Sequence, residues 1–142
     1  MARRPVAFVA ALVLFLEAFG VAFVNLTLGK VADNQHMSMA GVDPSAISTG
    51  AWVAGGVFGL YLLLCAFFLL RTGLTDRPAG RLGRVLLITC AVVHGVLGAL
   101  TWALVGWPAF VFMVVVLGLL VLTLLAYDKE RPASANGAPA AA

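Results

Sequence analysis

Two ionisable side chains stand in the middle of long apolar runs, and they are where chemistry is first expected. Glu17 lies within the run 5–28 and His94 within the run 85–105, and neither run holds another acidic or basic residue. A charged group at the centre of a bilayer costs about 2.5–3.5 kcal/mol on insertion scales, and an imidazole exchanges protons near neutral pH. Glu17 is therefore either a proton or cation site or a group that joins helices by a hydrogen bond.

The depth of these residues groups them into one candidate intramembrane polar site. Tyr61 and His94 each lie nine residues from the expected cytoplasmic end of their run, which is about 14 Å along a helix. Glu17 lies at a similar depth, so a Glu17–His94 pair with Tyr61 as a third hydrogen-bonding member is allowed. Asn25 follows Glu17 by two turns on the same face and extends the stripe outward. Depth alone leaves open whether each group instead satisfies a neighbour separately.

The elements that must position these groups follow from composition. Of the 142 residues, 63% are hydrophobic and 11% are charged, and the mean hydropathy is +1.07. A soluble domain has about a quarter charged residues, so a soluble globule and a nucleic-acid binder are both excluded despite the net charge of +3. Runs of about 20 apolar residues span a bilayer as helices. Four runs qualify: 5–28, 50–70, 85–105 and 108–127.

The distribution of basic residues predicts the orientation of this all-α, four-helix bundle. Eight of the nine basic residues flank one side of the spans, and Lys30 alone lies on the other. The eight are Arg3, Arg4, Arg71, Arg77, Arg81, Arg84, Lys129 and Arg131. The positive-inside rule then places both termini and the loop 71–84 in the cytoplasm, with the plasma membrane of a bacterium as the expected location.

The segments outside the spans are also predictable. The outer loop is expected over 29–49, although Asp43 followed by Pro44 is a helix-start signal, so the second helix is expected to begin near Pro44. The transmembrane domain covers 1–127. The segment 128–142 is rich in Ala and Pro without periodicity and is expected to be a disordered cytoplasmic tail.

Small residues one turn apart predict where helices approach each other closely in lipid. The second span carries Gly55 and Gly59 at this spacing. The third span carries Ala91, Gly95 and Ala99. We expect both stripes to be packing seams, and we favour seams within the chain over seams between chains.

Metal and redox chemistry have weaker signals. His36, Met37 and Met39 offer an imidazole and two thioethers, which suit copper(I), but the spacing is loose and we expect no metal and no cofactor. Cys65 and Cys90 lie at similar depth in adjacent spans. Buried thiols are common core residues, so packing is favoured over a redox couple.

Several short motifs carry a resemblance that covers nearly the whole chain except the tail. They are Leu16-Glu17-Ala18, Met37-Ser38-Met39-Ala40-Gly41, Trp52-Val53-Ala54-Gly55-Gly56, Val92-Val93-His94-Gly95 and Gly106-Trp107-Pro108. With them the chain resembles small uncharacterised four-span integral membrane proteins of high-GC actinobacteria. The resemblance implies four spans and carries no activity.

A second resemblance is architectural. Small multidrug resistance transporters are also short four-span chains with one membrane-embedded Glu in the first helix, where it binds protons and cationic drugs in a dimer. Glu17 matches that residue. The long outer loop and His94 depart from the pattern, which puts a shared activity in doubt.

Two functions are therefore expected from the sequence. The first is a non-enzymatic accessory or assembly component of a larger membrane complex, because the sequence shows no nucleotide-binding loop, no nucleophile–base arrangement and no metal cluster. The alternative is a proton-coupled carrier of a small solute or cation that uses Glu17 with His94. The expected partners are the lipid bilayer and either a larger complex or further copies of the chain.

Overall fold

The computed structural model describes residues 3–35 and 41–128, and these ranges are all-α. Four helices follow one another: α1 (Arg3–Asn34), α2 (Pro44–Thr75), α3 (Gly80–Leu104) and α4 (Trp107–Asp128). All four are long and apolar enough to cross a membrane. The predicted four-span helical architecture is confirmed by this arrangement.

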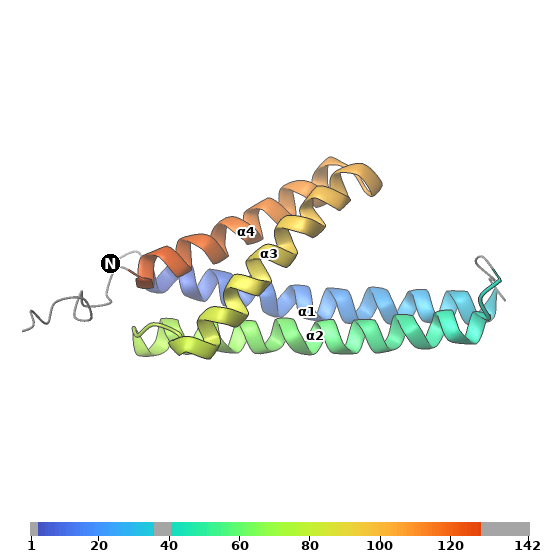
Figure 1. The fold of residues 1–142 in the computed structure, drawn as a ribbon, viewed down its shortest axis with the longest axis horizontal. Coiled ribbons are helices and arrows are strands. Elements are labelled where there is room, and N and C mark those ends of the chain that lie inside the picture. The colour runs from blue at the N-terminus through green and yellow to red at the C-terminus, as the bar shows by residue number, and fades with distance from the viewer. Residues whose placement is uncertain (1–2, 36–40, 129–142) are drawn as a thin grey trace, which may run out of the picture.

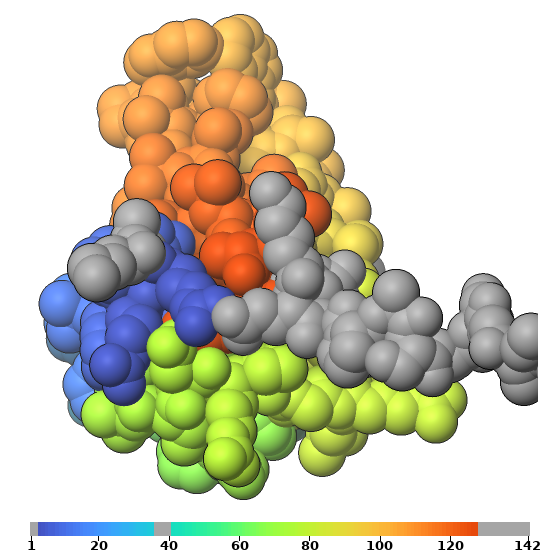
Figure 2. Space-filling view, turned by 90° about the vertical axis from the view of Figure 1, so that its left-hand side faces the viewer, coloured from blue at the N-terminus to red at the C-terminus, as the bar shows by residue number. Residues whose placement is uncertain are grey.

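The four helices form two antiparallel hairpins that cross obliquely (Figure 1). α1 packs along α2 over its length, and the α3–α4 hairpin meets them near one end and leans away toward the other. We call the end with Arg3 and the α2–α3 turn the terminal side, and the end with the α1–α2 and α3–α4 connections the loop side. Figure 2, seen from the terminal side, shows the tip of the α3–α4 hairpin standing clear of the first hairpin.

The first two helices are longer than the apolar runs that predicted them. α1 continues six residues past position 28, and α2 begins at Pro44, as the Asp43–Pro44 signal predicts. The Ser45 backbone N–H and hydroxyl donate to the Asp43 carboxylate at 2.8 and 2.7 Å and hold the pKa of that carboxyl below its ordinary 3.8. The loop predicted over 29–49 therefore shrinks, because hydropathy marks the membrane boundary rather than the end of a helix.

Glycines of α2 bring the first hairpin together, as the Gly55–Gly59 spacing predicts. A Cβ built on Gly55 would lie 2.5 Å from the Asn25 Cβ, and one on Gly59 would lie 3.3 Å from the Ala18 carbonyl oxygen. Cβ atoms in proteins do not approach other atoms as closely as 2.5 Å, so a larger residue at position 55 forces α1 and α2 apart. This seam lies within the chain, between α1 and α2.

The seam of the second hairpin differs from the predicted stripe. Ala91 is buried, but Gly95 and Ala99 are exposed in the described bundle. Gly98 faces α4 instead, where a Cβ would lie 3.4 Å from the Met113 Cβ. The small-residue pattern does not distinguish these neighbouring faces of one helix, and the buried face is set by the rotation of α3.

The core lies on the terminal side and in the middle of the bundle, where all four helices meet. Leucines from every helix are fully buried there, namely Leu14, Leu62, Leu69, Leu87 and Leu120. Alanines on α1 allow close approach of its neighbours, among them Ala7, Ala10 and Ala18. The loop-side tip of α3–α4 is instead exposed, with Leu104 80% exposed.

Two arginines at the start of α1 fasten the terminal side. Arg3 donates from Nε and Nη2 to the two carboxylate oxygens of Asp76, at 3.0 Å each. Arg4 donates to the carbonyl oxygens of Gly73 and Leu74 at the end of α2. The Arg3 guanidinium holds the pKa of Asp76 below its ordinary 3.8. Arg3 and Arg4, which predict the membrane orientation, thus also connect the start of α1 to the end of α2.

Candidate intramembrane site

Glu17 and His94 form a buried pair at the centre of the bundle. His94 Nε2 lies 3.1 Å from each carboxylate oxygen of Glu17. The side chain of His94 is fully buried, and that of Glu17 is 5% exposed. The two residues come from α1 and α3, which are diagonally opposed, because each packs against α2 and α4. The pair therefore bridges the two hairpins through the middle of the bundle.

The backbone of α3 holds the other side of the His94 ring. His94 Nδ1 lies 2.8 Å from the carbonyl oxygen of Cys90. A carbonyl oxygen only accepts, so a hydrogen bond in this contact is donated by Nδ1. The other ring nitrogen, Nε2, faces the two carboxylate oxygens of Glu17.

Helix lengths bring the two groups to one depth. Glu17 lies 14 residues after the first residue of α1, and His94 lies 14 residues after the first residue of α3. At 1.5 Å per residue, both side chains leave their helices about 21 Å from the terminal side. Two small residues are buried nearby along the same helices, Ala18 directly after Glu17 and Ala91 one turn before His94.

Tyr61 and Asn25 lie near the site but bond elsewhere. The Tyr61 hydroxyl donates to the Leu86 carbonyl oxygen at 3.1 Å, two turns before His94 on α3. The Asn25 amide donates to the Val21 carbonyl oxygen of its own helix at 2.9 Å. The rotation of α2 directs Tyr61 at the backbone of α3, which sequence depth could not reveal.

Two thiols extend the polar contacts from His94 toward α2. Cys90 Sγ lies 3.6 Å from His94 Nδ1, and Cys65 Sγ lies 3.8 Å from the Leu86 carbonyl oxygen. Both cysteines are buried and free. Cys65 thus shares the Leu86 carbonyl oxygen with Tyr61, and Cys90 lies beside the histidine that contacts Glu17. Cys90 and His94 are one turn apart on α3, which places their side chains on the same face of the helix.

A crevice between α1 and α4 ends on Glu17. It has a volume of about 510 Å³, which is in the range of small-ligand pockets. Its walls are apolar except for Glu17 and Asn25, and none of its described lining residues is basic. The lining residues are Val13, Leu16, Glu17, Gly20, Val21, Val24, Asn25, Phe112 and Met113.

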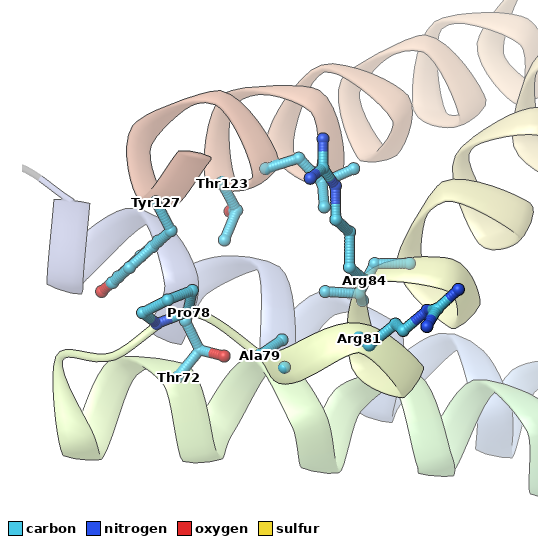
Figure 3. Close-up of a pocket in the computed structure, with 10 residues that line it drawn as sticks. Thr72, Pro78, Ala79, Arg81, Arg84, Thr123 and Tyr127 are labelled. Atoms are coloured by element: carbon cyan, nitrogen blue, oxygen red, sulfur yellow. The ribbon is translucent and has the colours of Figure 1, made fainter. Parts of the chain in front are cut away.

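A smaller cavity of about 100 Å³ lies on the terminal side, between the α2–α3 turn and the end of α4 (Figure 3). Thr72 and Thr123 face it, and their hydroxyls donate to backbone carbonyl oxygens one turn earlier. Figure 3 shows Arg84 rising toward α4 and the guanidinium of Arg81 turned away from the threonines. Sequence reasoning did not predict this cavity, because its walls come from three separate segments.

No group of three or more His, Cys, Asp or Glu side chains that could hold a metal ion occurs within 3–35 and 41–128. The weak metal candidates His36, Met37 and Met39 lie outside the described residues. So do Lys129 and Arg131, two of the basic residues that predict the orientation.

The fold and the site define a small four-helix integral membrane protein with a buried carboxylate–imidazole pair. Comparison of the chain with protein-family models, curated proteins and solved structures gives no match.

Proposed function

We propose that the protein is a non-enzymatic accessory component of a larger membrane complex, and that the crevice between α1 and α4 receives an apolar transmembrane segment of the partner. The observation that carries the proposal is the crevice itself, which opens where the two hairpins separate and is walled by apolar side chains. The Glu17–His94 pair joins the two hairpins and thereby holds them at the crossing angle that leaves the crevice open.

Filling the crevice tests this role without altering the pair. A Cβ on Gly20 meets nothing within 4 Å, and Gly20 lines the crevice. Gly20→Leu is therefore expected to fold normally and to abolish co-purification of a stoichiometric partner after gentle solubilisation. Gly118→Leu is the matched control, because a Cβ there also meets nothing within 4 Å and Gly118 is not among the crevice residues. Equal partner recovery from both variants would contradict the proposal.

A proton-coupled carrier is the second candidate, and one observation favours it. Glu17 lines the crevice and also contacts His94 Nε2, so a solute entering the crevice would meet an ionisable side chain. In proteoliposomes, a carrier would give solute uptake that depends on a pH gradient and is lost in Glu17→Gln. An accessory protein would instead show no uptake, and Glu17→Gln would reduce assembly.

The proposed setting is the plasma membrane of a bacterium, with the terminal side cytoplasmic. The support is the concentration of arginines at that side, at the start of α1 and around the α2–α3 turn, against Lys30 on the loop side. Reporter fusions test it. A fluorescent protein that matures only in the cytoplasm is expected to be bright when fused to the C-terminus.

A further inference from the structure

Two arginines at and just before the α2–α3 turn make no polar contact with the rest of the described bundle. Arg71, in the penultimate turn of α2, and Arg77, in the turn, are both exposed. Within the described ranges, neither side chain forms a hydrogen bond or an ion pair. The acid next to them in sequence, Asp76, is held by Arg3. The positive charge of the turn is therefore not neutralised by the neighbouring carboxylate.

These two side chains line one hollow. Its volume is about 220 Å³, well above the ~10–15 Å³ that a single water molecule needs. Beside Arg71 and Arg77 it is lined by Thr72, Thr75, Pro78, Ala79 and Gly80. Two arginines on one small hollow suit an anion with several oxygens, because each guanidinium group offers a planar set of N–H donors.

The start of α3 adds donors to the same hollow. Ala79, at the N-cap position, provides no side-chain hydrogen bond to the first turn, so the first N–H groups of α3 have no capping partner from it. Gly80, with φ +70° and nothing within 4 Å of a built Cβ, leaves the approach open. Such helix starts favour anions, although the arginines carry the argument.

The hollow lies at the edge of the apolar zone. Leu70 and Leu74, which flank Arg71 on α2, are 43% and 59% exposed. A ligand held by the arginines therefore lies beside apolar helix surface on one side and water on the other. This combination fits a lipid, with an anionic headgroup and acyl chains, better than a soluble anion.

We propose that the hollow of Arg71 and Arg77 binds the phosphate group of an anionic phospholipid. The two guanidinium groups donate to the phosphate oxygens, and the acyl chains run along the exposed leucines. Basic pockets between membrane helices hold such headgroups. The positive-inside rule alone predicts diffuse attraction to the surface, whereas this proposal requires one saturable site per chain. It is independent of what fills the crevice.

Native mass spectrometry and thermal unfolding of the full chain in mild detergent test the proposal. With added dioleoylphosphatidylglycerol, one retained lipid per chain and a saturable rise of the unfolding temperature are expected. With dioleoylphosphatidylcholine, neither is expected. Arg77→Gln and Arg71→Gln should each weaken retention about tenfold.

Arg81→Gln is the matched control, since it removes one positive charge near the same turn from a residue that does not line the hollow. It should retain the lipid nearly as well as the parent chain. Arg77→Lys keeps the charge but not the planar donor set, so partial loss is expected.

Three results would overturn the proposal. Equal retention of the two lipids would show that the phosphate charge is not recognised. An equal loss in Arg81→Gln and Arg77→Gln would show a diffuse charge effect. Stabilisation by millimolar inorganic phosphate, with no further effect of phosphatidylglycerol, would assign the hollow to a soluble anion rather than a lipid.

Discussion

The terminal side and the loop side of this bundle are built differently from the same kind of apolar sequence. On the terminal side all four helices meet around buried leucines, and Arg3 joins Asp76 across the first hairpin. On the loop side the two hairpins separate, and Leu104 is 80% exposed. Because lipid solvates apolar side chains as well as protein does, apolar sequence alone does not hold the hairpins together. Polar bridges and close-fitting small residues decide where they meet.

The Glu17–His94 pair is expected to show the largest effect of any single change. His94→Leu leaves the Glu17 carboxyl buried without its partner, which should cost about 3–5 kcal/mol of unfolding free energy. Unfolding in mixed detergent micelles measures it. The double variant Glu17→Leu/His94→Leu, which buries no unpaired group, should recover most of the loss. If His94→Leu unfolds like the parent chain, the pair is not what joins the hairpins.

A buried leucine of the terminal side should matter more than an exposed one of the loop side. Leu120→Ala opens a cavity where Leu120 is fully buried, and about 2 kcal/mol is expected, at the low end of the range for soluble cores because the reference state is lipid. Leu104→Ala should stay within about 0.5 kcal/mol. Thermal unfolding of the two variants side by side tests the contrast, which similar losses would abolish.

The first hairpin should be sensitive to small residues even on the loop side. Gly55→Ala brings a Cβ to 2.5 Å from Asn25, whereas Gly56→Ala meets nothing within 4 Å. Overpacking at Gly55 is expected to cost about 1–3 kcal/mol, and Gly56→Ala should be neutral or slightly stabilising. Unfolding midpoints separate the two. A tolerated Gly55→Ala would show that the α1–α2 seam is looser than described.

The smallest effect is expected at the Arg3–Asp76 ion pair and should appear with pH. The folded-state pKa of Asp76 lies below its ordinary 3.8, so the stabilising contribution is complete above that value. It is lost as pH falls through the lowered pKa. Unfolding temperatures measured from pH 5 to pH 2 should fall less steeply for Asp76→Asn than for the parent chain. Parallel curves would show that the Arg3–Asp76 ion pair does not contribute to the pH dependence of stability.

The sequence predicted the elements well and their rotation poorly. The four helices and the helix start at Asp43–Pro44 follow from rules that act within one segment, namely backbone satisfaction in lipid and capping. The depth shared by Glu17 and His94 likewise follows from counting residues. Whether they touch depends on the rotation of α1 and α3 about their axes, which the sequence does not give. The rotation of α3 also decides that Gly98, and not Gly95, packs closely against α4.

The terminal arginines illustrate a different limit. The positive-inside rule already accounts for the number of these arginines and for the side of the membrane on which they lie. The sequence therefore gives no reason to expect that they also form hydrogen bonds within the bundle. The contacts of Arg3 with Asp76 join residues 73 positions apart. Contacts of that separation emerge only once two helices of matched length have been laid side by side.

The length of the first hairpin has a further consequence for the bilayer. Thirty-two residues in each of α1 and α2 make a rod of about 48 Å, against about 30 Å of hydrocarbon. The hairpin must either tilt strongly from the membrane normal or project from the membrane by several helical turns. Its loop end carries Lys30, Asp33 and Asp43, which favours projection into water. Such a projecting helical hairpin would present a rigid binding surface to water-soluble molecules outside the bilayer.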